Sequence, residues 1–93
     1  MVEAVKLSEN WSEAEALDVL RDLLHKTCGI EPASIQLGSS LVKDLNIDSL
    51  GMMEAIIEAE DAFGVSIDAG ELSPTLTIQG LINVLSAKGV IKR

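Results

Sequence analysis

Ser49 has the most distinctive setting of any potentially reactive side chain, because it follows Asp48 where a polar loop changes into a helix-forming segment. Asp is a preferred N-cap residue, so the sequence predicts a helix that begins near Ser49 and ends at Phe63, before Gly64. The hydroxyl would lie in the first turn, where free N–H groups and the helix dipole favour an anion. A phosphate ester on Ser49 is therefore the chemistry that this position suits.

Other kinds of site fail on the residues present. The segment 44–48 starts like a calcium loop, but Ser49 and Ala55 occupy the positions of the required Gly and Glu. A serine nucleophile needs a base, and the single histidine, His25, belongs to a different predicted helix. Paired-carboxylate hydrolysis needs a substrate cleft, which a small helical domain can hardly provide. We expect neither catalysis nor a metal site.

The elements that position Ser49 are predicted to be helices. Ser12 and Glu15 form a capping-box pattern before an amphipathic segment that Gly29 closes, and Thr77 precedes a last helix that Gly89 closes. Asp68 is expected to cap a short turn through Leu72, with Pro74 stopping it. The connection 30–47 should be held to the core by its apolar residues, which are Ile35, Leu37, Leu41, Leu45 and Ile47.

No segment alternates as a strand would, so the prediction is a single all-α domain over residues 1–93. Its fold class is a four-helix bundle with three main helices, one short helix and a long first loop. We expect a loose arm at residues 1–10 and a frayed tail at residues 90–93.

The predicted helix 49–63 carries two apolar stripes. The expected core stripe is Met52, Ile56, Ala59 and Phe63. The second stripe is Leu50, Met53 and Ile57, and it is bordered by the acidic residues Glu54, Glu58 and Asp61. The second stripe could widen the buried face or dock a partner; docking is favoured because no Lys or Arg follows these acids at i+4.

Charge and composition exclude several partners. The net charge is −8, and eight acidic residues but no Lys or Arg lie between Asp44 and Ala87, which argues against nucleic acid and for a basic protein partner. No apolar run approaches the ~20 residues of a membrane span. The lone Cys28 cannot form an internal disulfide, which fits a reducing compartment, and we expect a cytoplasmic monomer.

The pattern D-L-x-x-D-S-L at residues 44–50, followed by E-x-x-F-G at residues 60–64, resembles the acyl carrier protein family, and the likeness spans about residues 12–88. The resemblance implies that Ser49 receives 4′-phosphopantetheine from coenzyme A. A holo-carrier synthase, a phosphopantetheinyl transferase that uses magnesium, would make the transfer. Asp48 would help to position that enzyme's metal and the coenzyme.

The resemblance also implies that the arm's thiol carries acyl thioesters between enzymes of fatty-acid, polyketide or related lipid biosynthesis. The partners would be an acyltransferase, ketosynthase or acyl ligase with basic docking patches. The implied docking residues are Leu50, Met53, Glu54, Ile57, Glu58 and Asp61.

Two departures from the family pattern favour a specialised carrier over a housekeeping one. Asn46 replaces a common glycine, and Gly51 replaces a residue that is often acidic or helix-favouring. A D-alanyl or peptidyl carrier loaded by an adenylating enzyme is an alternative, although the G-G-x-S signature of peptidyl carriers is absent. An unmodified helical adaptor that binds a basic partner is an alternative of another class.

Overall fold

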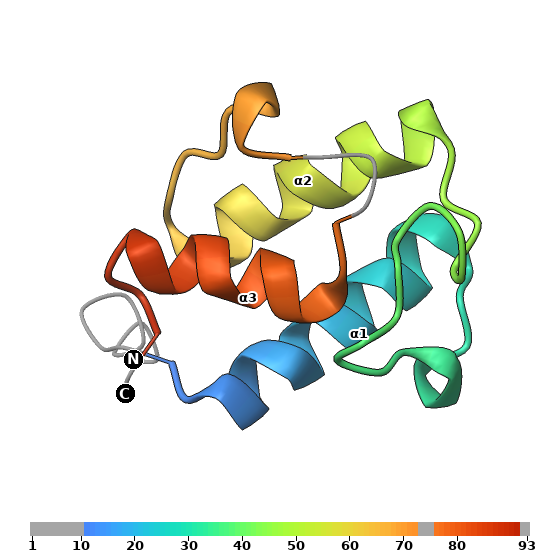
Figure 1. Ribbon diagram of the computed structural model, residues 1–93, viewed down its shortest axis with the longest axis horizontal. Coiled ribbons are helices and arrows are strands. Elements are labelled where there is room, and N and C mark those ends of the chain that lie inside the picture. The colour runs from blue at the N-terminus through green and yellow to red at the C-terminus, as the bar shows by residue number, and fades with distance from the viewer. Residues whose placement is uncertain (1–10, 73–75, 92–93) are drawn as a thin grey trace.

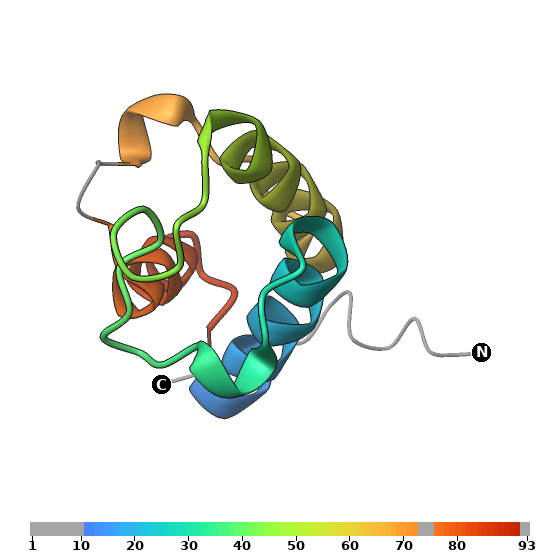
Figure 2. The same ribbon diagram turned by 90° about the vertical axis from the view of Figure 1, so that its right-hand side faces the viewer.

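The computed structural model describes residues 11–72 and 76–91. It contains the helices α1 (Glu13–Cys28), α2 (Ser49–Phe63) and α3 (Ile78–Ala87), with 3-10 turns η2 (Pro32–Ser34) and η3 (Ala69–Glu71). α1 packs against both α2 and α3, and the long first loop crosses the end of the bundle where α2 begins (Figures 1 and 2). The described residues form two isolated bridges and no strand, so the all-α prediction is confirmed.

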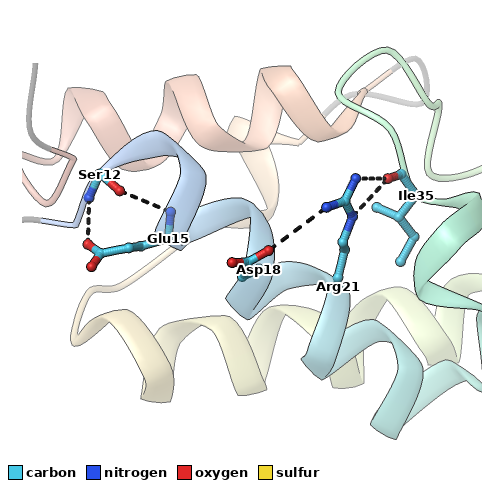
Figure 3. A network of polar contacts seen from close by, with 5 residues as sticks. All are labelled: Ser12, Glu15, Asp18, Arg21 and Ile35. Atoms are coloured by element: carbon cyan, nitrogen blue, oxygen red, sulfur yellow. Dashed lines mark hydrogen bonds and ion pairs between the residues drawn. The ribbon is translucent and has the colours of Figure 1, made fainter.

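Side-chain caps fix the helix ends. The Ser12 hydroxyl accepts a hydrogen bond from the Glu15 N–H at 3.0 Å, and the Glu15 carboxylate accepts one from the Ser12 N–H at 3.0 Å (Figure 3). Gly29 ends α1 with φ 70°, a left-handed conformation that glycine adopts without strain. The Thr77 hydroxyl accepts from the Gly80 N–H at the start of α3, so the predicted caps at Ser12 and Thr77 are confirmed.

The core is aliphatic apart from Phe63. Its fully buried large side chains come from α1, the first loop and α3: Leu20, Leu24, Ile35, Leu41, Ile78, Ile82 and Leu85. From α2, Ile56, Ala59 and Phe63 are buried as predicted, and Ala55 joins them. Met52 was expected in the core but is only half-buried, at the edge of the cluster.

The first loop is held to the helices by four of its five expected anchors. Its backbone is tied down as well, because the guanidinium group of Arg21 donates to the Ile35 carbonyl at 2.8 and 3.0 Å (Figure 3). Leu37 was predicted to be buried and is 39% exposed. A backbone hydrogen bond holds the loop at this point, because the Leu37 carbonyl accepts from the Gln79 N–H at 2.8 Å. The Leu37 side chain remains at the surface.

The predicted short fourth helix is a single 3-10 turn, η3. Asp68 was expected to cap this turn with its side chain. Instead, the Glu71 carboxylate accepts a hydrogen bond from the Asp68 N–H at 2.9 Å. The same carboxylate pairs with the Lys88 ammonium at 2.9 Å. The Asp68 N–H and then Lys88 hold the pKa of the Glu71 carboxyl below its ordinary value. Pro74, the expected stop of this turn, lies outside the described residues.

The end of the chain is better packed than predicted. The Trp11 N–H donates to the Val90 carbonyl at 2.7 Å, and the Ile91 side chain is 4% exposed. Trp11 also contacts Phe63 edge to face, with ring centroids 5.2 Å apart. The expected fraying is therefore wrong for Val90 and Ile91, whereas residues 1–10 and 92–93 lie outside the described part. Within the described part, no helix is long and apolar enough to cross a membrane.

Candidate functional site

Ser49 is the first residue of α2, and its side chain is exposed. Asp48 is the N-cap, as predicted, with its carboxylate accepting from the Gly51 N–H at 2.8 Å. The Met52 N–H donates to the Asp48 carbonyl. The N–H groups of Ser49 and Leu50 have no acceptor within the described residues, so the hydroxyl lies among unpaired donors at the positive end of the helix.

The loop before Ser49 is shaped by a turn around Ser40. The Asp44 carboxylate accepts from the Ser40 N–H at 2.7 Å, and the Ser40 carbonyl accepts from the N–H groups of Asp44 and Leu45. Asn46 then has φ 58°, the left-handed geometry that asparagine tolerates. The acidic residue that begins the D-L-x-x-D-S-L pattern therefore shapes the approach to Ser49.

Gly51, in the first turn of α2, lies next to Cys28 at the end of α1. A Cβ atom there would be 3.1 Å from the Asp48 carboxylate, 3.2 Å from Ile47 and 3.3 Å from the Cys28 sulfur. The Cys28 thiol also donates to the Gly51 carbonyl at 3.6 Å. In the sequence this glycine is a departure from the family pattern, and the structure adds a packing reason for it. Cys28 itself is half-buried and is the last residue of α1.

A groove of about 470 Å³ begins at Ser49 and runs along α2. Its lining is largely apolar and consists of Ser49, Met52, Met53, Ile56, Ile57, Glu60, Ile67 and Leu72. Ile67 and Leu72 were not recognised as site residues from the sequence, because they follow α2 by several residues. Their packing against the core or its edge, together with the hydrogen bond from the Ile67 N–H to the Glu60 carboxylate, places them opposite α2.

The second stripe faces outward. Leu50, Met53 and Ile57 are 63%, 60% and 56% exposed, so the stripe does not widen the buried face. These are the three most exposed large hydrophobic side chains in the described part of the chain. An exposed apolar row of this kind marks a surface that another molecule can cover.

The acids that border this stripe are not equivalent. Glu54 and Asp61 are exposed and form no ion pair within the described residues, whereas the Glu58 carboxylate lies 3.3 Å from the Lys26 ammonium. Comparing α2 residues at i+4 could not find this partner, since Lys26 lies on α1.

His25 lies nearby in sequence and contacts the Ile30 carbonyl through Nδ1 at 3.1 Å.

A family model described as a phosphopantetheine attachment site matches residues 18–85. An acyl carrier protein of Thermobifida fusca is 39% identical over 75 residues, which cover 81% of this chain and 95% of that protein. One from Myxococcus xanthus is 34% identical over 74 residues, covering 80% and 94%. A meromycolate extension acyl carrier protein of Mycolicibacterium aurum is 34% identical over 71 residues, covering 76% and 73%. The chain thus belongs to the acyl carrier protein family, whose members carry acyl groups on phosphopantetheine and are not themselves catalysts.

Proposed function

We propose that Ser49 carries the 4′-phosphopantetheine of this carrier. The observation that supports it best is the exposed Ser49 hydroxyl at the start of α2, beside the unpaired N–H groups of Ser49 and Leu50. Of the serines described within the matched segment, Ser49 alone begins an α-helix. Ser39 is buried, and the Ser40 hydroxyl accepts from the Lys43 N–H.

The residues around Ser49 fit a phosphodiester. At a helix N-terminus the dipole stabilises an anion by about 0.3–1 kcal/mol, and the free N–H groups supply hydrogen bonds. When attached, the arm supplies a thiol that holds an acyl group as a thioester. We assign to the Asp48 carboxylate the role of helping a synthase to hold its metal and the coenzyme; its bond from the Gly51 N–H, which fixes it beside Ser49, supports this assignment.

The groove along α2 suits an acyl chain. It begins at the attachment residue, and two of its lining residues, Met52 and Met53, are unbranched side chains that adapt to irregular occupants. Each CH₂ group removed from water there contributes about 0.8 kcal/mol at most. Comparing amide chemical shifts of holo and acyl forms tests this: unchanged shifts at Ile67 and Leu72 would exclude sequestration in the groove.

The family implies a phosphopantetheinyl transferase and enzymes of acyl biosynthesis as partners. We assign their docking surface to the second stripe with Glu54, Glu58 and Asp61, and we propose an acyltransferase, ketosynthase or acyl ligase with a basic patch. A monomeric, cytoplasmic carrier is part of this proposal, as is a specialised role. The name of the Mycolicibacterium relative gives one example of such a role, in meromycolate extension.

The attachment site is tested by intact mass. The full chain, incubated with coenzyme A and a promiscuous phosphopantetheinyl transferase, should gain one phosphopantetheine, which an unmodified adaptor would not. Ser49→Ala should gain none. Ser66→Ala, which changes an exposed serine outside the helices, should be loaded like the wild type. An adduct that persists in Ser49→Ala would refute the assignment.

A further inference from the structure

A second hollow lies between α1 and α2, next to the second stripe. It has a volume of about 400 Å³ and is lined by Lys26, Thr27, Glu54, Ile57 and Glu58. The Ile57 side chain belongs to both the hollow and the stripe, so the two surfaces are continuous. The hollow therefore extends the proposed docking surface from α2 onto the end of α1.

The hollow offers a partner one open carboxylate and one that is already paired. Glu54 and Glu58 lie one helical turn apart with Ile57 beside them. An Arg or Lys of a partner can lay its aliphatic stem on Ile57 and bring its charge to a carboxylate. Lys26 already supplies such a charge to Glu58, at 3.3 Å, whereas Glu54 has no ion pair within the described part.

We propose that Lys26 determines which basic partners dock on this surface, by holding Glu58 so that a partner's Arg or Lys is received at Glu54. The inference depends on the proposed function, because it takes the occupant to be a separate acyl-processing enzyme that presents basic and apolar side chains. Charge complementarity supports that occupant: the apolar row is flanked by carboxylates, and Lys26 is the one cation lining the hollow.

Lys26 acts in two ways on such a partner. Its ammonium neutralises Glu58, and it repels a partner cation aimed at the same carboxylate, which is discrimination by an unfavourable contact. Both side chains are partly exposed, at 66% for Lys26 and 40% for Glu58, so solvent screens the pair. Lys26 should accordingly change the affinity for a partner about two- to fivefold, which corresponds to the interaction free energies measured for exposed ion pairs.

The test uses an isotope-labelled full chain titrated with a synthetic amphipathic helical peptide that carries Arg and Leu on one face. A peptide with Gln in place of Arg controls for apolar binding. Lys26→Gln should lower the Kd for the Arg peptide about two- to fivefold in low salt. Binding should change the amide chemical shifts of α2, and the gain in affinity should fade in high salt. The Gln peptide should bind both forms equally.

Lys88→Gln is the matched control, because Lys88 is also paired with a glutamate, Glu71, and its loss changes the net charge equally. It follows α3, whose end lies at the opposite side of the molecule from the start of α2 (Figure 1). Glu58→Gln should weaken binding by exposing the Lys26 charge. The double change Lys26→Gln with Glu58→Gln should return the Kd to near the wild-type value, since a neutral pair replaces a neutral pair.

Two results would overturn the inference: a wild-type Kd in Lys26→Gln, or an equal gain in Lys88→Gln. The titration can be run with loaded and with unloaded chain, so it does not depend on the arm. A wrong attachment site shows in the mass experiment, whereas a wrong role for Lys26 shows only in the peptide titration.

Discussion

The Glu60 carboxylate accepts a hydrogen bond from the Ile67 N–H at 2.7 Å, so α2 itself fixes the segment that forms the opposite wall of the Ser49 groove. The Ile67 side chain, 7% exposed, packs into the core from the same segment. At Ile67 the wall is thus held by both a hydrogen bond and an apolar anchor. We infer that the width of the groove depends on Glu60 as well as on the apolar side chains that line it.

Replacing Glu60 with Ala should loosen this wall. A hydrogen bond to a charged group is worth about 1.5–3 kcal/mol, and partial exposure lowers the expected loss of unfolding free energy to about 1–2 kcal/mol. Urea unfolding measures that loss. Relative to the wild type, amide hydrogen exchange should become faster at Ile67, and this increase should be larger than any increase in α1. Glu54→Ala, an exposed change on the same helix, should cost under about 0.5 kcal/mol. Unchanged exchange at Ile67 would contradict this role for Glu60.

Gly51→Ala should destabilise the protein although alanine is the better helix former. Alanine gains about 1 kcal/mol in helix propensity, but its Cβ would crowd Asp48, Ile47 and Cys28 at 3.1–3.3 Å. Overpacking costs about 1–3 kcal/mol, so the expected net loss is about 1 kcal/mol. Urea unfolding should show that loss when Gly51→Ala is made in the wild-type protein, and a smaller loss in a Cys28→Ala background, where only the contacts with Asp48 and Ile47 remain. A more stable Gly51→Ala protein would mean that the neighbouring atoms move aside easily.

The sequence predicted the elements whose signals are local. The caps at Ser12, Asp48 and Thr77 and the end of α2 at Gly64 each depend on a residue's own chemistry. Helical periodicity likewise grouped Leu50, Met53 and Ile57 on one face, and the absence of a Lys or Arg at i+4 from the neighbouring acids favoured its exposure, which the structure shows. These signals were enough to place the Ser49 hydroxyl at the start of α2.

The features that the sequence did not reveal depend on contacts between distant segments. Lys26 meets Glu58 only because α1 packs on α2, and Ile67 faces the groove only because its segment folds back along α2. The outward side chain of Leu37 has the same origin, since backbone bonding to Gln79 replaces burial as the anchor. Periodicity reports which residues share a helix face but not which face meets a neighbour.

The stability contributed by Glu71 should be lost in acid. Its pKa is lowered in the folded state, so the ionised carboxylate contributes stability above the unfolded pKa, and that contribution disappears as the pH falls through the folded pKa. The difference in unfolding free energy between wild type and Glu71→Gln should be constant near neutral pH and shrink in the acidic range. A carboxyl titration followed by NMR gives the pKa directly, and Lys88→Gln should raise it. An ordinary pKa for Glu71 would contradict the bonding seen at η3.

Asp48→Asn should separate the structural and functional roles of Asp48. Asn is as good an N-cap as Asp, so its side-chain oxygen should still accept from the Gly51 N–H, and the unfolding free energy should change by less than about 0.5 kcal/mol. The negative charge proposed to assist the synthase is lost. Transfer of phosphopantetheine to Ser49 should then slow by about tenfold or more, as expected for one lost charged contact.

Asp48→Ala is the companion variant, because it removes both the cap and the charge. It should lose about 1 kcal/mol of stability in urea unfolding and also be loaded slowly. If Asp48→Asn is loaded at the wild-type rate while Asp48→Ala is slow, the carboxylate acts only by starting α2. If both are slow and only Asp48→Ala is destabilised, the charge itself takes part in loading, because the Ser49 hydroxyl is then presented on an intact helix in Asp48→Asn.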